Sequence, residues 1–196
     1  MLLCEIDHAL EKQFAQTYMQ TSFGETPAQY ALYKRMMKKY PEYVYTGPMY
    51  RVVGIRNQKF STFRTDEDVL RYIKRETIKR KATIQSWAST YKGVVRYNKL
   101  VTRRGISDTH VVPVLFQTAT GFDLRKFSME KGTHVSGLDN PRGAKIGVNH
   151  FAPSEQVYEV LSSPSNSITV LGYLHAGQLY TIKQIKKTYW HRAIVV

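Results

Sequence analysis

The stretch Gln156-Val157-Tyr158-Glu159-Val160-Leu161 places one carboxylate inside an apolar run that is typical of a β-strand. Burying a charged carboxylate costs free energy unless a partner or a chemical task compensates for it. Two earlier strings offer partners on other strands: Met49-Tyr50-Arg51-Val52-Val53 and Ile84-Gln85-Ser86-Trp87-Ala88-Ser89-Thr90. The sequence therefore directs attention to a glutamate, an arginine and a serine on three separate strands.

The composition predicts one globular domain with a strongly basic surface. The chain has 196 residues, of which 42% are hydrophobic and 12% aromatic, and this is enough for a buried core. Its 29 Lys and Arg residues against 15 Asp and Glu residues give a formal net charge of +14, which favours polyanionic partners. A single cysteine and scattered histidines indicate no disulfide within the chain and no metal site.

The helices are expected mainly in the N-terminal part. Residues 2–20 and 27–40 show helical spacing of apolar residues, and Thr26 and Pro27 are start signals for the second helix. The string Thr65-Asp66-Glu67-Asp68 predicts a capped helix, with Arg71, Arg75 and Lys79 on one basic side. That side is a solvated face or a surface for nucleic acid.

The strands are expected mainly after residue 50. Apolar and β-branched runs predict them at 50–55, 82–87, 111–116, 158–161, 168–174, 178–185 and 193–196. A short helix is predicted at 91–97, and a long loop at 130–154, where glycines and prolines are frequent. Helices followed by a strand-rich half predict an α+β fold.

The sequence lacks the motifs of several common catalytic and nucleotide-binding sites, and it lacks the signals for a membrane span or for secretion. No phosphate-binding loop, dinucleotide fingerprint or Gly-x-Ser-x-Gly string occurs. No apolar run approaches the roughly 18 residues of a membrane-spanning helix, and the first residues lack the basic segment of a signal peptide. We therefore expect a cytoplasmic protein without a membrane partner.

The order arginine, serine, glutamate resembles the arginine–serine–glutamate class of ADP-ribosyltransferases from phages and bacteria. Tyr50-Arg51-Val52 matches the aromatic-Arg-Gly string of that family except at the glycine, and Ser86-Trp87-Ala88 stands where many members have Ser-Trp-Thr. Val157-Tyr158-Glu159-Val160-Leu161 matches Glu-x-Glu-Val-Leu except at the first glutamate. The resemblance covers residues 44–196 and implies a split β-sandwich that binds NAD, preceded by a helical part over 1–43 within a single domain, 1–196.

The resemblance also implies an activity, in which NAD is cleaved at the nicotinamide–ribose bond and ADP-ribose passes to a protein or nucleic acid. Glu159 would stabilise the positive charge that develops as nicotinamide leaves, Arg51 would bind the pyrophosphate, and Ser86 would hold the glutamate in register. No metal is implied. If the chain is phage-encoded, the compartment would be the cytoplasm of the bacterial host.

Other residues are assigned by their position near these strings. Tyr50, Trp87 and Tyr91 are expected to contact the cofactor through their aromatic rings, together with Arg51 and Ser86. A second serine string, Phe60-Ser61-Thr62-Phe63, is a rival to Ser86, but it follows Arg51 too closely to reach a second strand through a helical crossover.

The acceptor side departs most from the family. The glutamate that the family associates with arginine acceptors is replaced by Val157, and Glu155 lies about 13 Å from Glu159 along an extended strand. Val157, Glu155 and Phe151 are therefore expected to line an acceptor side that is not built for arginine. Another protein side chain, a nucleic-acid base or terminal phosphate, and water all stay open as acceptors. Two rival interpretations are a non-catalytic nucleic-acid-binding protein and a transferase-like fold that only binds.

Overall fold

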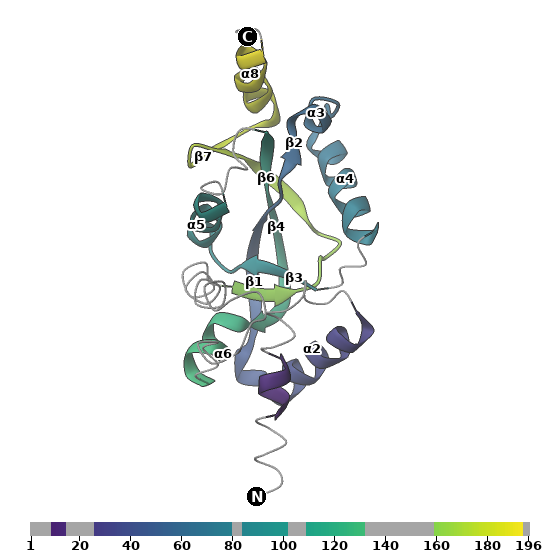
Figure 1. Ribbon diagram of the computed structural model, residues 1–196, viewed down its shortest axis with the longest axis vertical. Coiled ribbons are helices and arrows are strands. Elements are labelled where there is room, and N and C mark those ends of the chain that lie inside the picture. The colour runs from purple at the N-terminus through teal and green to yellow at the C-terminus, as the bar shows by residue number, and fades with distance from the viewer. Residues whose placement is uncertain (1–8, 15–25, 80–83, 102–108, 132–158, 194–196) are drawn as a thin grey trace, which may run out of the picture.

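The computed structural model describes residues 9–14, 26–79, 84–101, 109–131 and 159–193. These form a mixed α+β fold with a mainly antiparallel sheet, so the predicted α+β class is confirmed, whereas the split β-sandwich stays a prediction. Figure 1 shows an elongated arrangement, with α2 (Pro27–Lys39) and α6 (Leu124–Lys131) towards one end and α8 (Ile182–Ala193) at the other. None of the described helices combines the length and the apolar character that crossing a membrane requires.

The sheet is organised around β4 (His110–Asp123). Along one edge β4 pairs with β1 (Val44–Val52) over nine antiparallel positions, and its first residues pair with β2 (Ile55–Arg56). Its other edge pairs with β6 (Thr169–His175), which continues through a tight turn into β7 (Gln178–Tyr180). β4 is therefore the central strand, paired along both of its edges.

Two short strands close part of this sheet into a ring. β3 (Gln85–Ala88) and β5 (Glu159–Ser162) are antiparallel partners, and in Figure 1 they run across β1 and β4. β3 joins β1 through the single pair Tyr50↔Ala88, and β5 joins the end of β4 through Phe122↔Leu161. The order β1–β3–β5–β4 and the pairing of β4 back to β1 bring residues from distant parts of the chain together.

The predicted helix starts are confirmed at two places. Thr26 caps α2 with a complete capping box, and Pro27 occupies its first turn. At the start of α4 (Asp66–Lys79) the Asp68 backbone N–H donates to Thr65 Oγ1 over 3.2 Å, and the Thr65 N–H donates to Asp68 Oδ2 over 3.0 Å. The remaining described elements are a helix over residues 9–14, within the predicted helix 2–20, and η1 (Pro41–Tyr43), α3 (Asn57–Phe60) and α5 (Tyr91–Val101).

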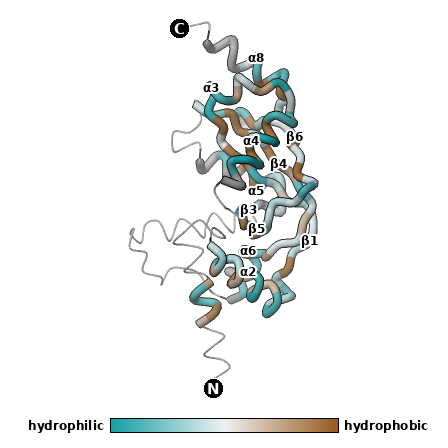
Figure 2. Tube along the Cα trace, turned by 90° about the vertical axis from the view of Figure 1, so that its right-hand side faces the viewer, coloured by the Kyte–Doolittle hydropathy of each residue, from teal (hydrophilic) through white to brown (hydrophobic). Residues whose placement is uncertain are grey.

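The core consists of three clusters of buried side chains. The largest joins the sheet to α3, α4 and α8, the second is an aromatic cluster between α2, α6 and the end of β4, and the third lies under α5. Figure 2 shows hydrophobic segments along the strands and more hydrophilic stretches on the helices. Strand residues with no exposure in these clusters include Met49, Val160 and Tyr173.

The predicted strand over 178–185 is wrong beyond Tyr180. Thr181 caps α8 instead, because its N–H donates to Gln184 Oε1 over 2.8 Å and the Gln184 N–H returns a bond to Thr181 Oγ1 over 3.3 Å. Ile182 and Ile185 are both buried, which fits one face of a helix. The last predicted strand, 193–196, is wrong at Ala193, which ends α8, and its other residues lie outside the described part.

Other element boundaries also differ from the prediction. β1 begins at Val44 and runs through Pro48, and β4 extends to Asp123. A proline such as Pro113 indicates an edge strand or a bulge. β4 pairs along both edges, so the edge alternative is wrong, whereas the bulge is confirmed beside it, between Val114 and Leu115. Within 130–154, residues 130–131 belong to α6, which was not predicted, and the rest lies outside the described residues.

Candidate functional site

Three residues from three strands are joined by two hydrogen bonds, one to the backbone oxygen of Ser86 and one from its hydroxyl. Arg51 Nη1 donates to the backbone oxygen of Ser86 over 2.6 Å, and Ser86 Oγ donates to Glu159 Oε1 over 2.5 Å. Arg51 lies on β1, Ser86 on β3 and Glu159 at the first position of β5. The structure thus brings together the three residues that the sequence singled out.

Strand register explains why Ser86 and Glu159 meet. Ala88 lies opposite Glu159 in the β3–β5 pair, and Ser86 lies opposite Leu161, so the serine and the glutamate are diagonal neighbours on one face. The residues between them, Trp87 and Val160, point to the other face and are buried. A shift of one residue in this register would turn both polar groups away from each other.

The electrostatics of Glu159 are unusual for a glutamate. Only 7% of the residue is exposed, and burial raises the pKa of its carboxyl from 4.5 to about 8. The cause is desolvation, which penalises the charged form. Ser86 is exposed and Arg51 is half-buried, so the chain of bonds leads from the surface to a buried acid.

The strand that carries Glu159 is fixed by side chains from three other elements. Tyr33 of α2 donates to the Leu161 oxygen over 3.1 Å, Trp87 Nε1 donates to the Ser162 oxygen over 3.2 Å, and Gln117 Nε2 donates to the Ser163 oxygen over 3.1 Å. Three successive carbonyl groups therefore have side-chain donors, which hold β5 in place.

Two of these donors were missed by the sequence reasoning. Gln117 is a fully buried amide in the apolar part of β4, and its Oε1 also accepts the Ser165 N–H over 2.6 Å. A glutamine following the apolar run 111–116 was the signal that could have identified it. Tyr33 gave no such signal, because its partner lies 128 residues further along the chain.

The three aromatic residues that were predicted to contact the cofactor fall into two groups. Tyr50 and Tyr91 are half-buried neighbours with ring centroids 6.2 Å apart, and Phe116 lies 5.4 Å from Tyr50 on the same side of the sheet. Trp87 is 2% exposed and packs in the largest core cluster, so it is a core residue and not a stacking surface. Of the three predicted aromatic contacts, Tyr50 and Tyr91 are retained as candidates.

The rival serine is placed elsewhere. Ser61 follows α3, and its Oγ donates to the Gln58 oxygen within the same turn, over 2.7 Å. Ser86, not Ser61, makes the bond to Glu159. The predicted acceptor-side residues Val157, Glu155 and Phe151 lie outside the described residues.

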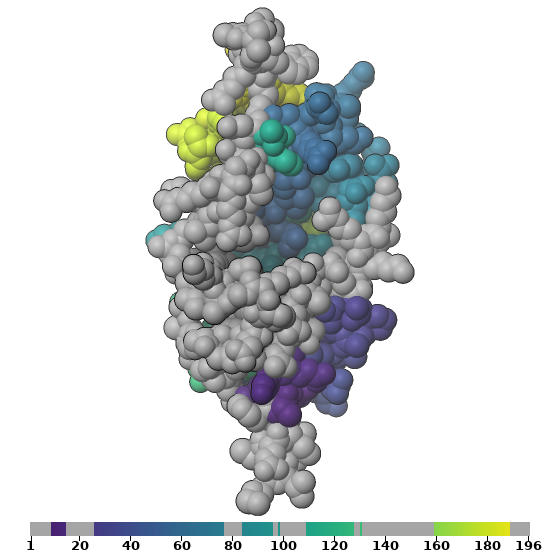
Figure 3. Space-filling view, in the orientation of Figure 1, coloured from purple at the N-terminus to yellow at the C-terminus, as the bar shows by residue number. Residues whose placement is uncertain are grey.

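Part of these strands reaches the surface. In Figure 3, blue and teal atoms, the colours of the segments around β1 and β3, are visible beside α4. Within the described ranges, no group of three or more His, Cys, Asp or Glu side chains is arranged to hold a metal ion.

This combination of groups suits chemistry on a cationic centre. A carboxyl with a pKa of about 8 can exist as acid or anion near neutral pH, and a hydroxyl and a guanidinium fix its surroundings. The anion would stabilise positive charge that develops on a bound substrate. No family model, no curated protein and no solved structure matched this chain, so the functional argument rests on the geometry of these residues.

Proposed function

We propose that the protein is an ADP-ribosyltransferase that uses NAD as its substrate. The observation that carries the proposal is the hydrogen-bonded chain from Arg51 through Ser86 to Glu159. Strand pairing assembles these residues from three strings far apart in the sequence, in the order in which the resembling family has its arginine, serine and glutamate.

Glu159 is the proposed catalytic residue. As the bond between the ribose C1′ and nicotinamide breaks, nicotinamide leaves with the bonding electron pair and positive charge develops on the ribose. A carboxylate beside the ribose stabilises that charge electrostatically, and its effect is largest where water is excluded. The burial of Glu159 provides such a site, and the raised pKa makes the active anion more abundant at higher pH.

Ser86 and Arg51 have supporting roles in this proposal. The Ser86 hydroxyl orients the carboxylate through its 2.5 Å bond to Oε1. Arg51 links β1 to β3 through the Ser86 carbonyl, and a guanidinium has further N–H donors that suit the pyrophosphate of NAD. Tyr50 and Tyr91, adjacent to this join, are the proposed contacts for a ring of the cofactor.

The acceptor is proposed to be a macromolecule. After nicotinamide leaves, a nucleophile of the acceptor forms a bond to C1′ and loses a proton. The net charge of +14 favours an acceptor that is a nucleic acid or is bound to one.

The proposal is tested with NAD labelled in its ADP-ribose part. The protein is incubated with bacterial extract, and released nicotinamide and labelled macromolecule are measured for wild type, Glu159→Gln and Ser86→Ala. Glu159→Gln should lower both signals by at least about 100-fold, because an electrostatic stabiliser of the transition state is lost. Matched controls are Glu67→Gln and Ser167→Ala, which change the same residue types at exposed positions.

Wild-type activity in Glu159→Gln would remove this residue from the mechanism. Absence of NAD turnover in the wild-type protein, with every extract tried, would refute the transferase function itself. Where a labelled product forms, digestion with nuclease or protease identifies the acceptor class.

A further inference from the structure

Three basic side chains from three helices meet around one aromatic cluster on the surface formed by α3, α4 and α8. Lys59 comes from α3, Arg75 from α4 and Lys186 from α8. The aromatic rings are those of Phe60, Phe63 and Tyr72, with centroid distances of 6.3 Å between Phe60 and Phe63 and 5.4 Å between Phe63 and Tyr72. We call this group, together with the exposed Arg64 next to Phe63, the basic cluster.

Contacts with the rings and with backbone oxygens position three of the four cations, Lys59, Arg75 and Lys186. Lys59 Nζ lies 5.6 Å from the Phe63 centroid and 5.5 Å from that of Tyr72, and the Arg75 guanidinium lies 5.8 Å from Tyr72. Lys186 Nζ donates to the backbone oxygens of Ser61 and Phe63. Cations that are already positioned lose less conformational entropy when they bind an anion.

Two of the three acids in the first turn of α4, Asp66 and Asp68, accept hydrogen bonds within the fold, whereas the third, Glu67, is exposed. Asp66 Oδ1 accepts the Tyr173 hydroxyl over 2.7 Å, and Asp68 Oδ2 accepts the backbone N–H groups of Arg64 and Thr65 at the start of α4. Among the described residues, Glu76 pairs with a cation of the cluster, because its Oε1 lies 4.0 Å from Arg75 Nε. Within the described part of the chain, Lys59 and Arg64 make no ion pair.

We infer that the basic cluster binds the phosphate backbone of a nucleic acid. The net charge of the chain is +14, and the cluster offers four neighbouring cations to one ligand. The rings of Tyr72 and Phe63 are already contacted by cations, so phosphate contacts, and not base stacking, are the expected mode. Such binding depends little on base sequence and falls steeply with salt.

This inference stands apart from the transferase proposal, because neither Arg51, Ser86 nor Glu159 belongs to the cluster. The proposed nucleic-acid surface also differs from the one that the sequence predicted. The prediction relied on α4 alone, whereas the structure adds Lys59 and Lys186 from two other helices.

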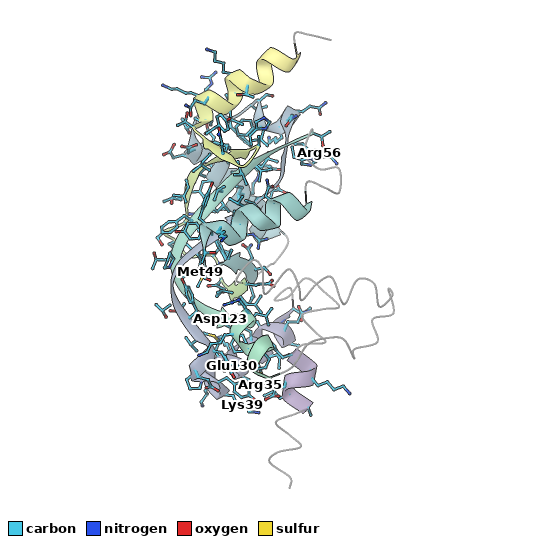
Figure 4. All side chains as sticks on the ribbon, turned by 90° about the vertical axis from the view of Figure 1, so that its left-hand side faces the viewer. Arg35, Lys39, Met49, Arg56, Asp123 and Glu130 are labelled. Atoms are coloured by element: carbon cyan, nitrogen blue, oxygen red, sulfur yellow. The ribbon has the colours of Figure 1, made fainter. Side chains whose placement is uncertain are left out.

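The test compares two triple variants of equal charge change. Lys59→Gln, Arg64→Gln and Arg75→Gln remove three cations from the basic cluster. Lys34→Gln, Arg35→Gln and Lys38→Gln remove three from α2, where Lys34 also lies 4.4 Å over a tyrosine ring, that of Tyr30. Figure 4 shows Arg35 towards the opposite end of the molecule from Arg56, which directly precedes α3.

Binding is measured by fluorescence anisotropy with a labelled DNA duplex of about 20 base pairs, between about 50 and 200 mM salt. The cluster variant should bind at least about tenfold more weakly, and the slope of log affinity against log salt should fall by about 2 to 3, since each phosphate contact contributes about 0.9. The α2 variant should keep a slope close to that of wild type.

Equal losses in the two triple variants would show that only net charge matters and would overturn the inference. So would the absence of binding at the lowest salt, or a stronger affinity for vesicles with anionic lipid than for the duplex. Circular dichroism shows whether each variant is folded. If the triple variant unfolds, the same binding measurement is made with the single variant Arg64→Glu. Arg64 is exposed and belongs to none of the core clusters.

Discussion

The buried acid Glu159 makes a specific prediction about how stability depends on pH. In the folded protein the pKa of its carboxyl is raised from 4.5 to about 8 by burial. The folded state therefore keeps the proton over a pH range in which the unfolded chain has released it. Because the unfolded state then binds fewer protons, the free energy of unfolding falls as the pH rises between these two pKa values.

The change Glu159→Gln removes this titration and preserves the shape of the side chain. One proton gives a slope of about 1.4 kcal/mol per pH unit, so the wild-type protein should lose about 2.7 kcal/mol relative to the variant between pH values of about 5.5 and 7.5. Below the lower pKa the two proteins should differ by a constant amount. Above a pH of about 8 the difference should level off again.

Urea denaturation of both proteins, at intervals of about half a pH unit, measures this difference. The six histidines and the other titrating groups are common to both proteins, so their contributions cancel in the comparison. The free energies of unfolding of the two proteins could instead differ by an amount that stays constant, within about 0.5 kcal/mol, between pH values of about 5.5 and 7.5. That result would show that the fold does not hold Glu159 protonated.

Three further outcomes are expected. In the proposed mechanism the anion of Glu159 is the active form, so kcat/KM for NAD, measured by nicotinamide release, should rise with pH to a plateau with an apparent pKa near 8. A rate that falls over this range would contradict that role. Tyr33→Phe should lower the free energy of unfolding by about 1 to 3 kcal/mol, since the buried Leu161 carbonyl loses its donor, and no change in the denaturant midpoint would be the contrary result. Thr181→Ala should cost about 1 kcal/mol through loss of the α8 cap, measured by thermal unfolding, with Thr188→Ala as the comparison inside the same helix.

The sequence predicted the parts of the fold whose signals are local. Arg51, Ser86 and Glu159 each stand in a run of β-branched or aromatic residues, and all three are on strands. The start of α4 was predicted because a capping box requires only residues three apart. Which strands pair is a non-local property, so the resemblance to a known order of residues, and not the local pattern, indicated that the three side chains meet.

The failures have equally physical reasons. The string around Thr181 has a Thr and a Gln three residues apart, which is a capping signal, but the apolar residues beside it were interpreted as a strand. Pro113 indicated an edge or a bulge, because proline cannot donate a backbone hydrogen bond, and only the strand pairing shows that the bulge is the alternative that occurs. The bonds of Tyr33 and Gln117 to the strand of Glu159 depend on tertiary contacts that no local pattern records.

The closed ring of β1, β3, β5 and β4 has a consequence for how the protein is made. β1 and β3 join through one residue pair, and Ser86 and Glu159 are 73 residues apart in the chain. Contacts of such long sequence separation form slowly, because loop closure must precede any stabilisation. A nascent chain that has not yet emerged from the ribosome as far as β5 contains the arginine and the serine but not the acid, so we expect the bond between Ser86 and Glu159 to form only after β5 has been synthesised.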